Sequence, residues 1–185
     1  MGQRLQAALF GLLLTMASLH AAAKEPLTFP EIKTEDLTGG KAAFPADFPG
    51  DPTLVLVAFE QEQQKDVDQW VAALSLKDDV SIPWIEMPTV ARRYRLIKPL
   101  LDGWMRDGIP AIADQERVFT VYTRRKSFRS ALGVTRSDTV LAVVARPNGQ
   151  ICAIVEGLPT PEAIERIRGA MGLVTPGGVD TGTCS

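Results

Sequence analysis

The stretch TLVLVAFEQEQQKDVDQW, residues 53–70, begins with a pattern typical of a fully buried strand. A polar, glutamine-rich corner follows, and then a helical pattern. Its first seven residues are apolar or β-branched, which predicts a strand covered on both faces. Apolar residues then recur at helical spacing and predict an amphipathic helix from about Lys65 to Leu76, with an inward face made of Val67, Trp70, Val71 and Leu74. A strand that passes directly into a helix is the first unit of an α/β sheet.

The clearest local pattern lies near the C-terminus. TVLAVVA (139–145) and ICAIVEG (151–157) are two apolar runs joined by RPNGQ. A Pro-Asn-Gly turn between such runs predicts an antiparallel hairpin. Thr160 and Pro161 then cap and begin a last helix.

The segments between these two units read as further strands and helices. IPWIEMP (82–88) and RVFTVYT (117–123) predict strands, and KSFRSALG (126–133) predicts a short helix. A longer helical pattern lies between the two strands, and Pro99 within it is expected to kink or divide the helix. Its apolar stripe is expected to face the core and consists of Tyr94, Ile97, Leu100, Leu101, Trp104 and Met105.

The order of these elements predicts one α/β domain, with a mixed sheet flanked by helices and a C-terminal hairpin and helix. The domain proper is expected over residues 53–172. Residues 24–52 are rich in proline and are expected to be an extended N-terminal segment of the domain, with a short hairpin around Gly39 and Gly40. The glycine- and threonine-rich tail, 173–185, is expected to be disordered.

Residues 1–23 resemble an export signal. Arg4 precedes a mostly apolar run, and small residues precede Lys24, so cleavage is expected after Ala23. This pattern predicts a periplasmic or secreted protein. An uncleaved N-terminal membrane anchor is the alternative.

Removal of the leader from the 185-residue chain leaves 162 residues with 19 basic and 22 acidic side chains, a net charge of −3. Such a balance argues against nucleic acid as a partner. The same cut removes His20, the only histidine, and with it every histidine-based dyad, zinc site or general base. No catalytic residue, metal site or cofactor is predicted.

A βαβ half followed by a ββα half resembles the thioredoxin-like plan, and PADFPGDPTLVLVAF (45–59) resembles the entrance to that fold in its peroxiredoxin-like relatives. In thioredoxins the first cysteine of the CxxC pair lies five residues after the equivalent of Phe59, and the second lies three residues later. Gln64 and Val67 occupy these positions here, and neither forms a thiolate. The proline that thioredoxins place before the first hairpin strand is also missing from RSDTVLAV (136–143). The resemblance implies a redox-inactive member of the superfamily.

Three central segments, IPWIEMP, LLDGWMRDGIP and RVFTVYTRRKSFRSALGV, are similar to the assembly-factor family for the membrane sector of mitochondrial ATP synthase. The similarity runs from about Pro45 to Met171, although Trp104 stands where that family commonly has glycine. It implies a domain that assists or binds proteins of a membrane complex. The matched positions are Glu86, Met87, Pro88, Met105, Arg106, Gly108, Ile109, Pro110, Val121, Tyr122 and Thr123.

The two cysteines leave several interpretations open. Cys152 lies inside an apolar strand, which is typical of a buried, inert thiol, and Cys184 lies in the tail. A disulfide between them is the second interpretation, since export leads to an oxidising compartment. A thiol-redox protein of peroxiredoxin ancestry that uses Cys152 or Cys184 is the alternative function.

Charge is unevenly distributed along the chain. Residues 92–129 contain ten basic and four acidic side chains, a local charge of +6, whereas residues 52–91 have a local charge of −5. The basic segment is either a solvated surface with internal ion pairs or a surface that attracts an acidic protein, a membrane complex or anionic lipid. Trp104 is either a core residue or an interface anchor. The interaction candidates are Arg92, Arg93, Arg95, Lys98, Trp104, Met105, Arg106, Arg124, Arg125 and Lys126.

Overall fold

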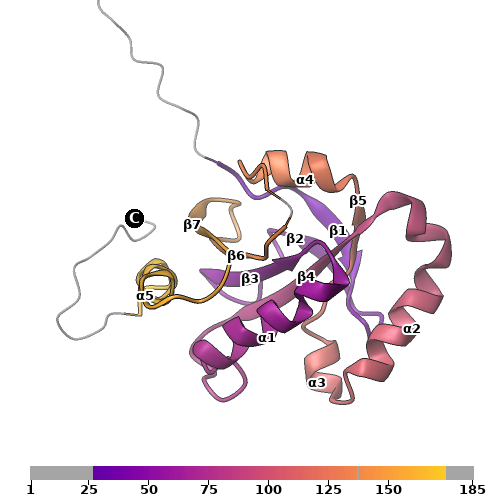
Figure 1. Cartoon of the computed structure of the whole chain (residues 1–185), viewed down its shortest axis with the longest axis horizontal. Helices are drawn as coiled ribbons and strands as arrows, with labels where there is room; N and C mark the ends of the chain where they lie inside the picture. Colours follow the sequence, from indigo (N-terminus) through magenta and orange to yellow (C-terminus); the bar gives the residue numbers. More distant parts are fainter. Residues whose placement is uncertain (1–26, 137, 174–185) are drawn as a thin grey trace, which may run out of the picture.

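The computed structural model describes residues 27–136 and 138–173. A five-stranded sheet has the order β5-β4-β3-β6-β7, and Figure 1 shows helices on both sides of it. β3, β4 and β5 are parallel, while β6 is antiparallel to β3 and β7 is antiparallel to β6. The strands are β3 (Thr53–Ala58), β4 (Trp84–Ala91), β5 (Val121–Thr123), β6 (Leu141–Ala145) and β7 (Ile151–Glu156). This is the mixed α/β arrangement that the order of elements predicted.

The central strand β3 is buried along its whole length, as its apolar sequence requires. Alternate residues enter different cores, with Leu54 and Leu56 on one face and Val55 and Val57 on the other. β4 continues past Pro88 to Ala91, three residues beyond the predicted end, because it pairs there with β5.

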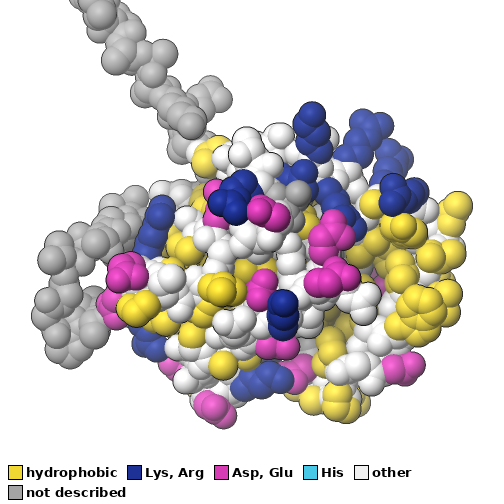
Figure 2. Space-filling view, viewed as in Figure 1, with side chains coloured by type: hydrophobic (Ala, Val, Ile, Leu, Met, Phe, Trp, Pro, Cys, Tyr) yellow, Lys and Arg dark blue, Asp and Glu magenta, His cyan; other side chains and the backbone are white. Residues whose placement is uncertain are grey.

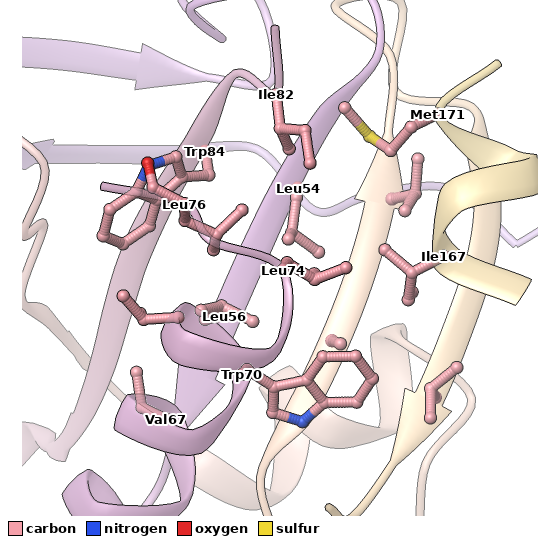
Figure 3. Packing of buried hydrophobic residues seen from close by; sticks show 14 of the residues in the cluster. Leu54, Leu56, Val67, Trp70, Leu74, Leu76, Ile82, Trp84, Ile167 and Met171 are labelled. Carbon is pink, nitrogen blue, oxygen red and sulfur yellow. The ribbon is translucent and has the colours of Figure 1, made fainter. Parts of the chain in front are cut away.

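The first core lies under α1 (Gln64–Ala73) and α5 (Pro161–Ala170). Figure 3 shows Trp70, Leu74 and Ile167 converging on this face of the sheet. Trp70 is fully buried, and its indole Nε1 donates a hydrogen bond to the carbonyl of Gly157 at 2.8 Å. The indole therefore links α1 to the end of the C-terminal hairpin.

The second core lies under α4 (Arg125–Ala131) and the N-terminal hairpin of β1 (Ile32–Glu35) and β2 (Lys41–Phe44). The hairpin reverses around Gly39 and Gly40, as the sequence predicted. The aromatic rings of Phe29, Phe44 and Phe48 pack together here, with centroids 5.1–5.2 Å apart.

A helical arm leaves the sheet between β4 and β5. It consists of the 3-10 helix η2 (Arg92–Ile97), α2 (Lys98–Gly108) and α3 (Ile112–Gln115). Pro99 stands in the first turn of α2, so it begins the helix and does not kink it, because a first-turn proline loses no helical hydrogen bond.

The predicted core stripe of this arm is wrong for four of its six residues. Tyr94, Ile97, Leu100 and Trp104 are exposed, Leu101 and Met105 are half-buried, and the one buried residue of α2 is Asp102. The physical reason is that both faces of the sheet are already covered, whereas α2 lies beside the β5 edge, at the right of Figure 1. An amphipathic pattern shows that a helix has an apolar face, but it does not show that anything covers that face.

The expected signal segment, 1–23, and all of the expected tail except Leu173 lie outside the described residues. No helix in the described part of the chain is long and apolar enough to span a bilayer.

Candidate functional site

The corner after β3 carries glutamines in structural roles. The Gln63 side chain is buried, and its Oε1 accepts hydrogen bonds from the backbone N–H groups of Phe59 (2.7 Å) and Glu60 (3.3 Å). Gln64 begins α1 and is exposed, while Val67 is buried in the first core. The two positions that would carry a thiol pair therefore hold an exposed amide and a core residue, neither of which is a redox group. The capping role of Gln63 was not predicted from the sequence.

Glu86 lies next to this corner, on β4. Its Oε2 accepts a hydrogen bond from Gln64 Nε2 at 3.3 Å. Burial raises the pKa of Glu86 above its usual value, and the negative charge of Asp68 acts in the same direction, against the lowering effect of the Gln64 hydrogen bond. Within residues 27–136 and 138–173, no group of three or more His, Cys, Asp or Glu side chains is placed to hold a metal ion.

Cys152 lies on the edge strand β7, packs partly against the first core, and is disulfide-bonded. A bonded sulfur is neither the inert free thiol that its strand position suggested nor a ready nucleophile, because attack requires a thiolate. Cys184 is the one other cysteine of the sequence and lies outside the described residues, so the pairing of Cys152 with Cys184 stays a prediction.

Basic side chains gather at one edge of the sheet for a topological reason. Ala91 and Thr123 are paired at the ends of the parallel strands β4 and β5, so Arg92 and Arg124, the next residues, leave the sheet at the same edge. Figure 2 shows dark blue side chains over this part of the surface, above the arm. Five of the predicted basic residues are exposed and make no ion pair with any described residue: Arg92, Arg93, Arg95, Arg124 and Lys126.

Other predicted candidates have structural roles. Arg125 pairs with Glu60, beside the corner after β3. Arg106 donates from Nη1 to the carbonyl of Leu37 at 3.1 Å. Met105 is half-buried, and its sulfur accepts a hydrogen bond from Thr120 Oγ1. These contacts join residues far apart in the sequence, which is why charge counting did not find them.

Lys98 belongs to a polar cluster that attaches the arm. Asp102 is 4% exposed and accepts hydrogen bonds from Lys98 Nζ at 2.5 Å and from Tyr122 Oη at 3.0 Å. Lys98 also reaches Glu35 at 3.4 Å. Burial lowers the pKa of Lys98, but the hydrogen bond and charge of Asp102 outweigh that effect and raise it above its usual value. The cluster joins α2, β5 and β1.

Trp104 is 62% exposed, so its interpretation as a core residue is wrong. Figure 2 shows apolar side chains in yellow at the right, on the side where α2 lies in Figure 1, next to basic side chains. We use the name outer face for the four most exposed large apolar residues of the arm, Leu96, Leu100, Trp104 and Ile112.

Comparison by sequence finds no matching protein family and no matching curated protein. Comparison of the fold finds BsSco, a member of the Sco family of cytochrome c oxidase assembly proteins, with a TM-score of 0.55 and 13% identity over 82% of this chain and 99% of BsSco. A protein from Aquifex aeolicus VF5 proposed to act in electron transfer has a TM-score of 0.54 and 13% identity, over 77% of this chain and 96% of that protein. The N-terminal domain of PilB from Neisseria gonorrhoeae has a TM-score of 0.50 and 14% identity, over 73% and 86%.

The fold is thioredoxin-like. These neighbours cover most of this chain and nearly all of their own lengths, so the likeness concerns the whole domain and not one βαβ unit. The fold class predicted from the order of elements is confirmed. At 13–14% identity the likeness concerns the fold alone, and the two sequence comparisons do not confirm the similarity to the ATP synthase assembly factors.

Proposed function

We propose that this thioredoxin-like domain is a non-catalytic accessory or assembly factor that binds a protein of a membrane complex through its helical arm. The observation that carries the proposal is the outer face, four exposed apolar residues beside five basic side chains that pair with no acid in the described part of the chain. Exposed apolar patches of this kind mark interaction sites.

The thioredoxin corner supports a binding role over a catalytic one. Gln63, Gln64 and Val67 serve capping, surface and core roles there, and Cys152 is disulfide-bonded on the far edge strand. The similarity of the central segments to the ATP synthase assembly factors supports an assembly role, and BsSco is an assembly protein with the same fold. The leader pattern supports action on the exported side of a membrane, as a periplasmic, secreted or N-terminally anchored protein.

Site-specific crosslinking in living cells tests this function. A photoreactive phenylalanine replaces Trp104 in one strain and Val80, an exposed apolar residue in the loop after α1, in a control strain. We expect position 104 to crosslink to a subunit of a membrane complex and position 80 not to do so. Reversal of Arg92, Arg95 and Arg124 to Glu should abolish the adduct without unfolding the domain, since these side chains are exposed. Identical adducts at both positions would disprove the assignment.

A redox assay tests the competing function. The wild-type protein should neither reduce insulin disulfides with dithiothreitol as the electron source nor consume peroxide, because no CxxC pair is present at the corner. Activity that disappears in the Cys152→Ser variant would make the chain a thiol-redox protein and refute the non-catalytic assignment.

A further inference from the structure

The outer face is presented by a segment that projects from the sheet edge. Leu100 and Trp104 lie four residues apart on α2 and so occupy one side of the helix. Leu96 on η2 is 92% exposed and Ile112 on α3 is 66% exposed, so each of the three consecutive elements of the arm presents an exposed apolar side chain. No described side chain buries the outer face.

The basic side chains lie along one border of the outer face. Arg92, Arg93 and Arg95 lie on η2 in the turns before Leu96, and Arg124 and Lys126 follow the neighbouring strand β5. Figure 2 shows the dark blue side chains directly beside the yellow ones. An apolar face with a tryptophan and a border of unpaired arginines is typical of helices that lie in the interface of an anionic bilayer.

The position of the outer face suits a flat partner. Helices and peptides that dock through apolar anchors often insert them into a groove. The two best-defined clefts, of about 850 and 390 Å³, are lined by residues of the N-terminal hairpin, β5, α4 and the β6–β7 turn, and by Arg95 and Lys98. None of the four outer-face residues lines either of these two clefts, so a flat bilayer interface fits them better than a helix or peptide that inserts into a groove.

The attachment of α2 fixes which of its sides faces outward. Asp102 is held by Lys98 and Tyr122 on the inner side of the helix. Leu100 and Trp104 on the outer side therefore keep their orientation relative to the basic border. A preformed interfacial surface does not have to fold when it binds.

We propose that the outer face lies on an anionic phospholipid surface, with Leu100 and Trp104 at the boundary between headgroups and acyl chains and with Arg92, Arg95 and Arg124 on lipid phosphates. This proposal rests on the interaction role assigned to the arm above, because a domain docked on the bilayer through the outer face would meet the subunits of a membrane complex at the same residues.

Trp104 provides a built-in reporter. Of the three tryptophans, Trp70 is fully buried and Trp84 is 2% exposed, so a change in emission on binding arises mainly from Trp104. The probe is a vesicle of phosphatidylglycerol and phosphatidylcholine, and the control is a vesicle of phosphatidylcholine alone. We expect co-sedimentation and a blue shift of emission with the anionic vesicles only, quenching by brominated acyl chains, and release in 0.5 M salt.

Variants separate the apolar from the charged contribution, with sedimentation as the readout. One variant combines Leu100→Ser with Trp104→Ser, and the other combines the reversals of Arg92, Arg95 and Arg124 to Glu. Each variant should have a partition coefficient more than about tenfold below that of the wild type. The matched controls are Val80→Ser with Leu158→Ser, two exposed apolar residues outside the arm, and Lys65→Glu on α1. These controls should bind as the wild type does.

The outcomes distinguish this proposal from the function proposed above. No binding to anionic vesicles, equal binding to neutral ones, or an equal loss in the control variants would overturn the lipid proposal. If the crosslink from position 104 to a protein subunit persisted in that case, the arm would be a protein-binding surface and the assembly function would stand. Loss of both readouts would remove both assignments.

Discussion

Replacing Asp102 with alanine tests whether one buried carboxylate holds the arm to the domain. Asp102 is the buried residue of α2, and it accepts hydrogen bonds from Lys98 at 2.5 Å and from Tyr122 at 3.0 Å. Other contacts of the helix include those of the half-buried Leu101 and Met105 and the hydrogen bond from Arg106 to Leu37. The free energy of unfolding should therefore depend strongly on this one side chain.

The expected loss follows from the two hydrogen bonds. A hydrogen bond to a charged group contributes about 1.5–3 kcal/mol, so two of them give an upper value of about 6 kcal/mol. The variant also removes the cost of burying the carboxylate, and the Lys98 side chain is 30% exposed and can return to water. We expect Asp102→Ala to lower the free energy of unfolding by about 2–3 kcal/mol. Asp102→Asn, which still accepts from Tyr122, should lose about half of that.

Urea unfolding followed by circular dichroism at pH 7 measures the effect. Asp107→Ala is the matched control, since Asp107 is an exposed acid on the same helix, and it should change stability by less than about 0.5 kcal/mol. A double-mutant cycle with Lys98→Met should give a coupling of about 1 kcal/mol or more. An Asp102→Ala protein as stable as the control would refute the reasoning.

The same cluster determines an alkaline pH dependence. The pKa of Lys98 is raised by Asp102, and the pKa of Tyr122 is raised first by burial and then by the charge of Asp102. The folded state therefore holds protons that the unfolded state releases above pH 10.0–10.5. The contribution of both groups is complete below that range and is lost as the pH rises through their folded-state values. This alkaline loss should be smaller in Asp102→Ala.

Three further predictions concern the rest of the domain. Trp70→Phe should lower the free energy of unfolding by about 2 kcal/mol, because it removes a hydrogen bond and leaves a cavity. Trp104→Ser should change it by less than about 0.5 kcal/mol, and urea unfolding measures both variants. Gln63→Ala should cost about 1–2 kcal/mol, since a buried backbone N–H loses its acceptor, and Gln63→Glu should restore most of the stability in the same assay. Glu86→Gln should raise the free energy of unfolding at pH 7 and raise it less at pH 4. The reason is that burial raises the pKa of Glu86, so its ionisation weakens the folded state as the pH rises. Equal increases at both pH values would contradict this.

The parts of the fold that were predictable are those set by local pattern. The apolar and β-branched sequence of β3 predicted a strand buried on both faces. RPNGQ predicted the hairpin of β6 and β7, and Gly149 adopts φ 88° in that turn. Val67, Trp70 and Val71 at helical spacing predicted the buried side of α1 correctly. These features depend on neighbours in sequence, which periodicity reports.

The surface roles were less predictable because they depend on partners far along the chain. Arg125 and Glu60 lie 65 residues apart, and Arg106 and Leu37 lie 69 apart, yet each pair is in contact. Counting charges along the sequence found ten basic residues in one segment. It could not show which of them are exposed and which form hydrogen bonds or ion pairs with other parts of the domain. The position of Arg92 next to Arg124 follows from the pairing of β4 with β5, which no local motif encodes.

The way α2 is attached bears on why its apolar side is free. A helix that needed only stability would bury Leu100 and Trp104, since apolar burial stabilises without the desolvation penalty of a carboxylate. Here the buried residue of the helix is Asp102, Leu101 and Met105 are half-buried, and Leu100 and Trp104 are exposed. A buried, hydrogen-bonded carboxylate fixes the rotation of the helix, because turning it would leave the charge unpaired. Local choices that work against stability occur at functional sites in natural proteins. The arm has two of them, a buried acid and an exposed tryptophan, and both agree with the interaction role proposed for the outer face.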